Sequence, residues 1–338
     1  MMPSATATKS QPEVETPIDP SRKARVVAVA NQKGGVGKST TAVNLGAAIA
    51  ETGKRVLIID MDPQGNASTG LGIEPGRRQV GVYQVMSQGV PVLEAIMETA
   101  VPGLWAIPST IDLAGAEIEL VGQISRETKL LRALEPVLQS YDFVILDCPP
   151  SLGLLTVNAL TACDELIVPI QCEYYALEGL GQLLRNVRLV QQNLNPKLRL
   201  TGIVMTMFDS RTKLSEQVVA EVKRYFGPRV YDTIIPRTVR LSEAPGFGLP
   251  ITLYDSQSKG AKAYRDLAKE FLRREATDLP LPEDEPPSVI AIERPEQMEE
   301  EDMPESEMSD GPGTMTELVE PQEWPSGGNG QSEGGEES

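Results

Sequence analysis

Residues 26–30 form a short apolar run that leads directly into a glycine-rich loop. The loop reads Asn31-Gln32-Lys33-Gly34-Gly35-Val36-Gly37-Lys38-Ser39-Thr40. A loop of this kind between a strand and a helix presents backbone N–H groups to a phosphate chain, and the helix that follows adds the positive end of its dipole. Two positions depart from the usual pattern, since Gln32 replaces its first glycine and a second lysine, Lys33, comes next.

The end of the loop predicts nucleotide chemistry. Lys38 is placed to reach the β- and γ-phosphates, and the Ser39 hydroxyl to ligate Mg²⁺. A glycine cluster between a strand and a helix also occurs as simple turn chemistry. Here the preceding strand, the following helix and the Gly-Lys-Ser end all agree with phosphate binding, so we expect residues 33–40 to line the site.

The net charge of −17 is concentrated at one end of the chain. Residues 276–338 hold 19 acidic residues against one basic residue, Arg294, so the other 275 residues sum to +1. This tail is rich in Pro, Gly, Ser and Glu, and we expect it to be disordered because it cannot bury enough apolar surface. We expect the same of an N-terminal leader, residues 1–23, which leaves one folded domain over residues 24–275.

Composition excludes several kinds of site. The chain has no histidine, so Ser-His, Cys-His and His-metal chemistry are excluded. Its three cysteines, Cys148, Cys163 and Cys172, form no C-x-x-C pair, which argues against a zinc site or a disulfide framework. Neither a signal-peptide core nor a run of 18 apolar residues is present, so we expect a cytoplasmic protein with no membrane partner.

Short apolar segments alternate with amphipathic ones through the body of the chain. This predicts a doubly wound α/β fold, with one mostly parallel sheet covered by helices on both faces. The expected strands are 25–31, 55–61, 103–107, 141–147, 165–170, 199–207 and 231–235. The expected helices are 38–52, 91–99, 112–120, 126–139, 151–162, 175–193, 214–226 and 259–274.

Acidic side chains end two of these strands, where ligands of such sheets bind. One strand ends in Asp60-Met61-Asp62-Pro63, and another in Asp147-Cys148-Pro149-Pro150. An apolar strand ending in Asp is the arrangement that holds Mg²⁺ beside a phosphate-binding loop, although alone it would more often cap a helix. Alternation places Asp60 and Asp62 on one face, so periodicity does not choose between them.

Together these segments resemble the ParA family of chromosome- and plasmid-partitioning ATPases, within the deviant Walker A class that also contains MinD. The resemblance extends over roughly residues 24–274 and is nearest to the chromosomal type. It implies a P-loop NTPase fold with ATP and Mg²⁺ as ligands. The segments that carry it are residues 33–40, 60–66, 147–150, 173–179 and 235–245.

The resemblance also implies a role for each site residue. Lys33 resembles the signature lysine, which crosses a homodimer interface to the partner's ATP. Asp62 matches the catalytic carboxylate that positions the attacking water, and Asp147 the acid that holds Mg²⁺, commonly through a water. Turnover is expected to be slow until a ParB-type centromere-binding protein stimulates it.

A basic segment follows the core motifs. Residues 211–274 carry 13 basic against 7 acidic residues, and Arg237 and Arg240 lie in the part that resembles the family's non-specific DNA-binding region. No base-reading motif accompanies them, so we expect phosphate contacts and association with the nucleoid. On composition alone, a solvated basic face that balances the tail is the simpler interpretation. Met207 and Pro236 follow strands near the nucleotide face and are candidates for adenine contacts.

Two other functions share parts of this pattern. A MinD-like membrane-associated positioning ATPase would need a basic amphipathic terminal helix, whereas this sequence ends in an acidic segment. An iron–sulfur carrier shares the lysine-rich loop but needs paired or dimer-facing cysteines. We expect Cys148, Cys163 and Cys172 to be buried structural thiols instead.

Overall fold

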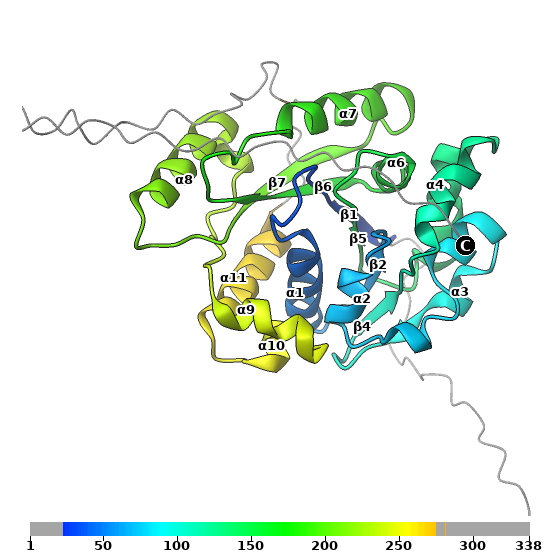
Figure 1. Cartoon of the computed structure of the whole chain (residues 1–338), viewed down its shortest axis with the longest axis horizontal. Helices are drawn as coiled ribbons and strands as arrows, with labels where there is room; N and C mark the ends of the chain where they lie inside the picture. Colours follow the sequence, from blue (N-terminus) through cyan, green and yellow to red (C-terminus); the bar gives the residue numbers. More distant parts are fainter. Residues whose placement is uncertain (1–22, 275–280, 282–338) are drawn as a thin grey trace, which may run out of the picture. The chain divides into compact units, whose positions relative to one another are not determined.

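A seven-stranded sheet with the order β3-β4-β2-β5-β1-β6-β7 forms the centre of the protein (Figure 1). The structure is a computed structural model that describes residues 23–274 and Leu281. All neighbouring strands are parallel except β3, which pairs antiparallel with β4. The strands are β1 (Arg25–Val29), β2 (Val56–Asp60), β3 (Met97–Glu98), β4 (Leu104–Ile107), β5 (Phe143–Asp147), β6 (Glu165–Gln171) and β7 (Arg199–Thr206).

Helices cover both faces of this sheet (Figure 1). Alternate residues of β1 enter two different apolar clusters: Val27 and Val29 pack with α1 and α11, while Val26 and Ala28 pack on the side of α4 to α8. The predicted doubly wound α/β class is therefore confirmed. The α-helices are α1 (Lys38–Ala50), α2 (Asn66–Gly70), α3 (Val92–Ala95), α4 (Leu113–Val121), α5 (Lys129–Leu134), α6 (Leu154–Ala162), α7 (Leu180–Asn193), α8 (Lys213–Phe226), α9 (Val239–Glu243), α10 (Ile251–Tyr254) and α11 (Lys259–Arg273).

Two predicted elements were wrong. Residues 231–235 do not form a strand, because the backbone N–H groups of Asp232 and Thr233 donate to the Glu270 carboxylate of α11 at 2.8 and 2.9 Å. The helix expected over 91–99 ends at Ala95, and the next residues pair with β4. The edge of the sheet is thus closed by a short antiparallel strand.

Two further helices are shorter than expected for local reasons. The helix predicted over 175–193 begins at Leu180, since Gly179 has a left-handed backbone with φ of 74°. The one predicted over 126–139 is divided into a turn, α5 and a turn that contains Pro136, which has no N–H to continue a helix.

The described residues 24–274 lie within the predicted domain and end one residue before its predicted boundary. Among the helices of residues 23–274, none has the length and hydropathy that a membrane-spanning helix requires. The three cysteines are buried and free, as expected. The disorder expected for the leader and the tail concerns residues that lie outside the described ones, apart from Lys23 and Leu281.

Candidate nucleotide-binding site

The glycine-rich loop connects β1 to α1 in a conformation that only its glycines accept readily. Gly35 and Gly37 have φ of 74° and 87°, in the left-handed region. Between them Val36 is buried, and its carbonyl accepts a hydrogen bond from Thr206 of β7 at 2.9 Å. No side chain caps the N-terminus of α1, which leaves its first N–H groups facing the loop. The loop therefore has the form of an anion cradle.

Lys38 lies inside this cradle. Its side chain is buried, and its ammonium donates to the Lys33 carbonyl at 3.1 Å. Burial lowers the pKa of Lys38, while the carboxylates of Asp147 and Asp62 oppose that shift. A cation held among acids beneath a loop of N–H groups is suited to a phosphate chain.

The second lysine points elsewhere. The Lys33 ammonium forms an ion pair with Glu173 and donates to the Tyr175 carbonyl at 3.2 Å. Both acceptors belong to the connection between β6 and α7. This pairing could not be predicted from sequence patterns, because the two residues are 140 positions apart.

Asp60 and Asp62, between which periodicity could not choose, have different environments. Asp60 accepts from the backbone N–H of Ser68 at 2.7 Å and from its hydroxyl at 2.6 Å. Burial raises the pKa of Asp60 to about 6, against the effect of these bonds. Asp62 lies in the loop beyond β2, where its Oδ1 accepts from Gln64 N at 2.9 Å. Asp60 is thus held in place by α2, and Asp62 by its own loop.

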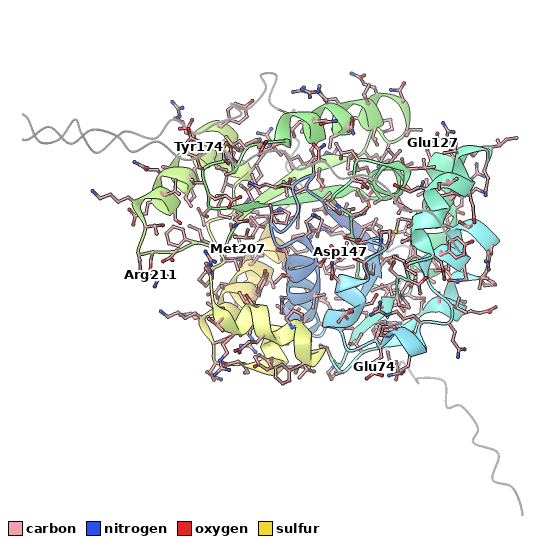
Figure 2. The ribbon with its side chains drawn as sticks, viewed as in Figure 1. Glu74, Glu127, Asp147, Tyr174, Met207 and Arg211 are labelled. Atoms are coloured by element: carbon pink, nitrogen blue, oxygen red, sulfur yellow. The ribbon has the colours of Figure 1, made fainter. Side chains whose placement is uncertain are left out.

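Asp147 at the end of β5 is buried without any hydrogen-bond partner among the described residues, at either oxygen. Burial raises the pKa of Asp147 well above its ordinary value, and Asp60 adds to that rise. The Ser39 hydroxyl is near enough to oppose the shift but does not reach hydrogen-bonding geometry. Two unpaired carboxylate oxygens beside a hydroxyl fit a hydrated Mg²⁺, a hard cation that binds through few protein oxygens. Figure 2 shows Asp147 in the interior of the fold.

Met207 and Pro236 line one cavity of about 310 Å³ beside the loop. The Phe208 N–H donates to the Ile235 carbonyl at 3.1 Å, which holds the two segments together. Gly37, Thr40 and Tyr264 lie on the same cavity. The structure therefore brings both candidate adenine contacts next to the phosphate-binding loop.

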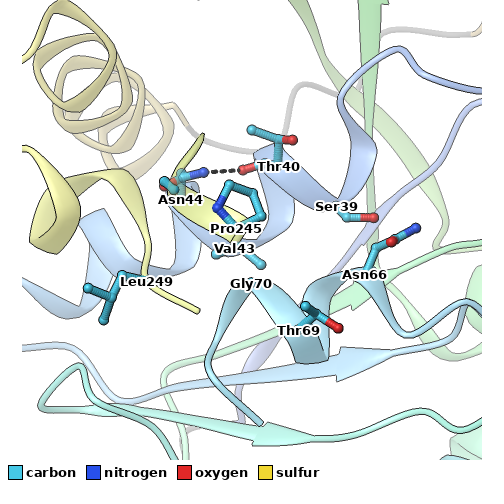
Figure 3. Close-up of a pocket in the computed structure, with 10 residues that line it drawn as sticks. Ser39, Thr40, Val43, Asn44, Asn66, Thr69, Gly70, Pro245 and Leu249 are labelled. Carbon is cyan, nitrogen blue, oxygen red and sulfur yellow. Dashed lines mark hydrogen bonds between the residues drawn. The ribbon is translucent and has the colours of Figure 1, made fainter. Parts of the chain in front are cut away.

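A second, smaller cavity of about 200 Å³ lies between the start of α1 and the helix α2 (Figure 3). The polar residues Ser39, Asn66 and Thr69 line it together with the apolar Val43 and Pro245. Thr40 lines both cavities. The start of α1 therefore borders both cavities.

Arg237 and Arg240 are both exposed, the first just before α9 and the second within it. Arg240 contacts Glu243 at 3.1 Å and Asp255 at 3.5 Å, while Arg237 lines the Met207 cavity. Arg211 lies at the outer edge of the molecule (Figure 2), where it pairs with Asp209. Basic groups thus occupy the surface that continues from the nucleotide site.

Comparisons with known proteins agree with this geometry. Residues 24–200 match the family model described as an AAA domain. The chain is 60% identical over 246 residues to the sporulation initiation inhibitor protein Soj of Bacillus subtilis, covering 73% of this chain and 97% of that protein. It is 54% identical over 254 residues to the chromosome partitioning protein ParA of Caulobacter vibrioides, covering 74% and 95% respectively.

Solved structures show the same fold. A Mycobacterium smegmatis protein described as cobyrinic acid a,c-diamide synthase, with bound ADP and magnesium, is 44% identical with a TM-score of 0.66. The match covers 74% of this chain and 94% of that one. MinD of Pyrococcus horikoshii, at 23% identity and a TM-score of 0.59 over 74% of this chain and 96% of its own, shares the fold. Sequence identity, fold and site geometry agree: the chain belongs to the ParA/Soj family of chromosome-partitioning ATPases.

Proposed function

We propose that this chain is an ATP-dependent DNA-partitioning ATPase that acts as an ATP-sandwich homodimer and is stimulated by a ParB-type centromere-binding protein. Its ATPase domain is assigned to residues 24–275, between the leader 1–23 and the acidic tail 276–338. The observation that carries the proposal is the gathering of Lys38, Asp62 and Asp147 beneath the glycine-rich loop. This set suits phosphoryl transfer, which needs positioning and neutralisation of charge more than covalent help.

The protein binds ATP and Mg²⁺. Loop N–H groups from residues 33–40 and the Lys38 ammonium hold the phosphates, while Met207 and Pro236 contact the adenine. Ser39 and Asp147 hold Mg²⁺, the latter through a water, which explains why the Asp147 oxygens have no partner among the described residues. The metal neutralises charge on the β- and γ-phosphates.

ATP hydrolysis needs a water aligned with the γ-phosphate. Asp62 orients this water from the loop after β2, where its own backbone contacts fix it. Lys33 reaches the nucleotide of the second subunit, by the logic of an arginine finger supplied in trans. Intrinsic turnover is slow, because the site is complete only in the dimer and with the stimulating partner.

DNA binding is non-specific and uses the exposed Arg237 and Arg240 to contact phosphates. It places the protein on the nucleoid, in the cytoplasm. Each phosphate contact contributes about −0.9 to the log–log slope of affinity against salt concentration.

Size-exclusion chromatography with light scattering, with and without ATP and Mg²⁺, tests the dimer. We expect the parent and Asp62→Ala to shift to a dimer with ATP, the variant more persistently because it does not hydrolyse the nucleotide. Lys33→Ala is expected to bind ATP and stay monomeric. A dimer of Lys33→Ala equal to that of the parent contradicts the proposal.

Retention on DNA tests the second activity. Arg240→Glu should abolish ATP-dependent retention while nucleotide binding persists. Arg273→Glu is the matched control, since Arg273 is also exposed and changes the net charge equally from the last residue of α11. Equal loss in both variants would show that net charge, and not this segment, accounts for retention.

A further inference from the structure

Lys33 is engaged within its own subunit. Its ammonium pairs with the Glu173 carboxylate and also donates to the Tyr175 carbonyl at 3.2 Å. The side chains of Lys33 and Glu173 are 24% and 37% exposed, so the pair lies at the surface and remains open to exchange. A surface pair of this kind is weak enough for a more highly charged anion to displace it.

The fold keeps Glu173 in this position. The N–H of Cys172, the preceding residue, donates to the Thr206 carbonyl of β7 at 3.0 Å, and the Glu173 N–H donates to the Gln171 carbonyl at 2.9 Å. On the loop side, the Lys33 N–H donates to Asn31 Oδ1, and the Asn31 amide donates to the Pro169 carbonyl of β6. Both members of the pair are therefore anchored to the end of β6 through their backbones.

A second contact joins the same two segments. The Gln32 amide donates to Gln182 Oε1 of α7 at 3.0 Å. The Gln32 side chain also lies against Gly179, where an added Cβ would approach Gln32 Oε1 to 3.1 Å. The first half of the phosphate-binding loop and the β6–α7 connection thus form one contact surface, with the Lys33 ammonium at its exposed side.

We propose that Glu173 is a positioning residue that holds Lys33 in the monomer and competes with the partner's nucleotide for it. The inference rests on the proposed function, in which Lys33 acts in trans. Glu173 offers one negative charge, so Lys33 leaves it for the larger negative charge of the partner's triphosphate when two subunits meet. The ion pair sets the ATP concentration at which dimers form.

Glu173→Gln tests this inference, because glutamine keeps the size of the side chain and removes its charge. Sedimentation velocity with Mg²⁺ and a non-hydrolysable ATP analogue measures the concentration of the analogue at which half of the protein is dimeric. Release of two surface pairs per dimer predicts a value about two- to thirtyfold lower than in the parent. An unchanged or higher value overturns the inference.

Glu178→Gln is the matched control, since Glu178 is an exposed carboxylate in the same connection and its loss changes the net charge equally. Its half-maximal concentration should equal that of the parent, and a shift as large as that of Glu173→Gln overturns a specific role. Glu173→Asp keeps the negative charge but holds it one methylene further from Lys33. It should therefore lower the half-maximal concentration less than Glu173→Gln does. Melting temperatures within about 4 °C of the parent show that the folds are intact.

The double variant Lys33→Ala/Glu173→Gln separates the two proposals. If Glu173 acts through Lys33, the double variant behaves as Lys33→Ala does. Normal dimers of Lys33→Ala would overturn the proposed function together with this inference. Monomeric Lys33→Ala with an unshifted Glu173→Gln would overturn the role of Glu173 alone.

Discussion

Asp60 and Asp147 lie directly opposite each other, as register partners at the carboxyl ends of the parallel strands β2 and β5. Of these two carboxyl groups, Asp60 accepts hydrogen bonds from the backbone N–H and the hydroxyl of Ser68. Asp147 has no hydrogen-bond partner among the described residues. Two adjacent buried carboxyl groups disfavour their charged forms in each other's presence. The sheet therefore places one carboxyl group that is fixed by the fold beside another that is left for a ligand.

Asp147→Asn should uncouple stability from function. The amide removes a buried acid whose ionisation is disfavoured by burial, so we expect the free energy of unfolding without nucleotide to rise by about 1–3 kcal/mol near neutral pH. The same change should abolish the enhancement of ATP binding by Mg²⁺. Chemical denaturation and calorimetric titration with and without Mg²⁺ measure the two effects.

Asp112→Asn is the control for that prediction, because Asp112 is exposed at the start of α4. It should leave both quantities unchanged. If Asp147→Asn binds ATP with the Mg²⁺ dependence of the parent, Asp147 is not the metal-holding acid.

Asp60→Asn should change how stability depends on pH. The pKa of Asp60 is raised from 3.8 to about 6 by burial, so between these values the folded protein holds a proton that the unfolded chain has lost. The contribution of Asp60 to the free energy of unfolding is fully present below the lower pKa of 3.8, and it is lost as the pH rises through the upper pKa of about 6. The loss is about 3 kcal/mol at most, and Asn removes it.

Urea denaturation at several pH values from about 4 to 7, without nucleotide or Mg²⁺, measures the difference between the two proteins. We expect the parent to lose stability relative to Asp60→Asn across this window. Parallel stability curves would show that Asp60 is ionised in the fold throughout.

The sequence predicted the central strands because they are buried on both faces and read as continuous apolar runs. It failed where a side chain replaced the usual strand partner. Residues 231–235 are apolar enough for a strand, but Glu270 takes the N–H groups of Asp232 and Thr233, and isolated bridges form only on either side of the segment, at Val230 and Pro236. Such long-range substitution leaves no local trace in the sequence.

The site was predictable to a similar extent. Loop residues and strand-end acids are local signals, and the structure does bring Lys38, Asp62 and Asp147 together. The partner of Lys33 was not predictable, because Glu173 comes from a distant connection that only the order of β1 and β6 places beside the loop. The assigned roles of these residues remain predictions.

Gly202→Ala should be strongly destabilising. Gly202 lies within β7, and an added Cβ would approach Tyr231 Cε2 to 1.9 Å. Because the Tyr231 ring is buried, it cannot move away easily. Overpacking of this kind costs about 1–3 kcal/mol or more, which corresponds to about 2–4 °C in melting temperature for each kcal/mol. Differential scanning calorimetry measures the change.

Gly122→Ala provides the comparison. Gly122 follows α4 with a right-handed backbone and has nothing within 4 Å of an added Cβ. We expect its melting temperature to stay equal or rise slightly, by the reduced freedom of the unfolded chain. Similar losses in both variants would argue against the contact with Tyr231 as the cause.

Removal of the acidic tail should strengthen DNA binding at low salt. A chain ending at Leu279 lacks 18 acidic residues and the single arginine of the tail, so its net charge changes from −17 to about zero and its repulsion of DNA phosphates falls. ATPase activity should be retained, since the site residues lie between Lys33 and Pro236.

Because Leu281 packs against the core, a chain ending at that residue is the control for stability. Fluorescence anisotropy with a labelled duplex, at low and at high salt, should show a gain that disappears as salt screens the charges. Equal DNA affinity of the shortened and full-length chains at low salt would exclude an electrostatic role of the tail in DNA binding.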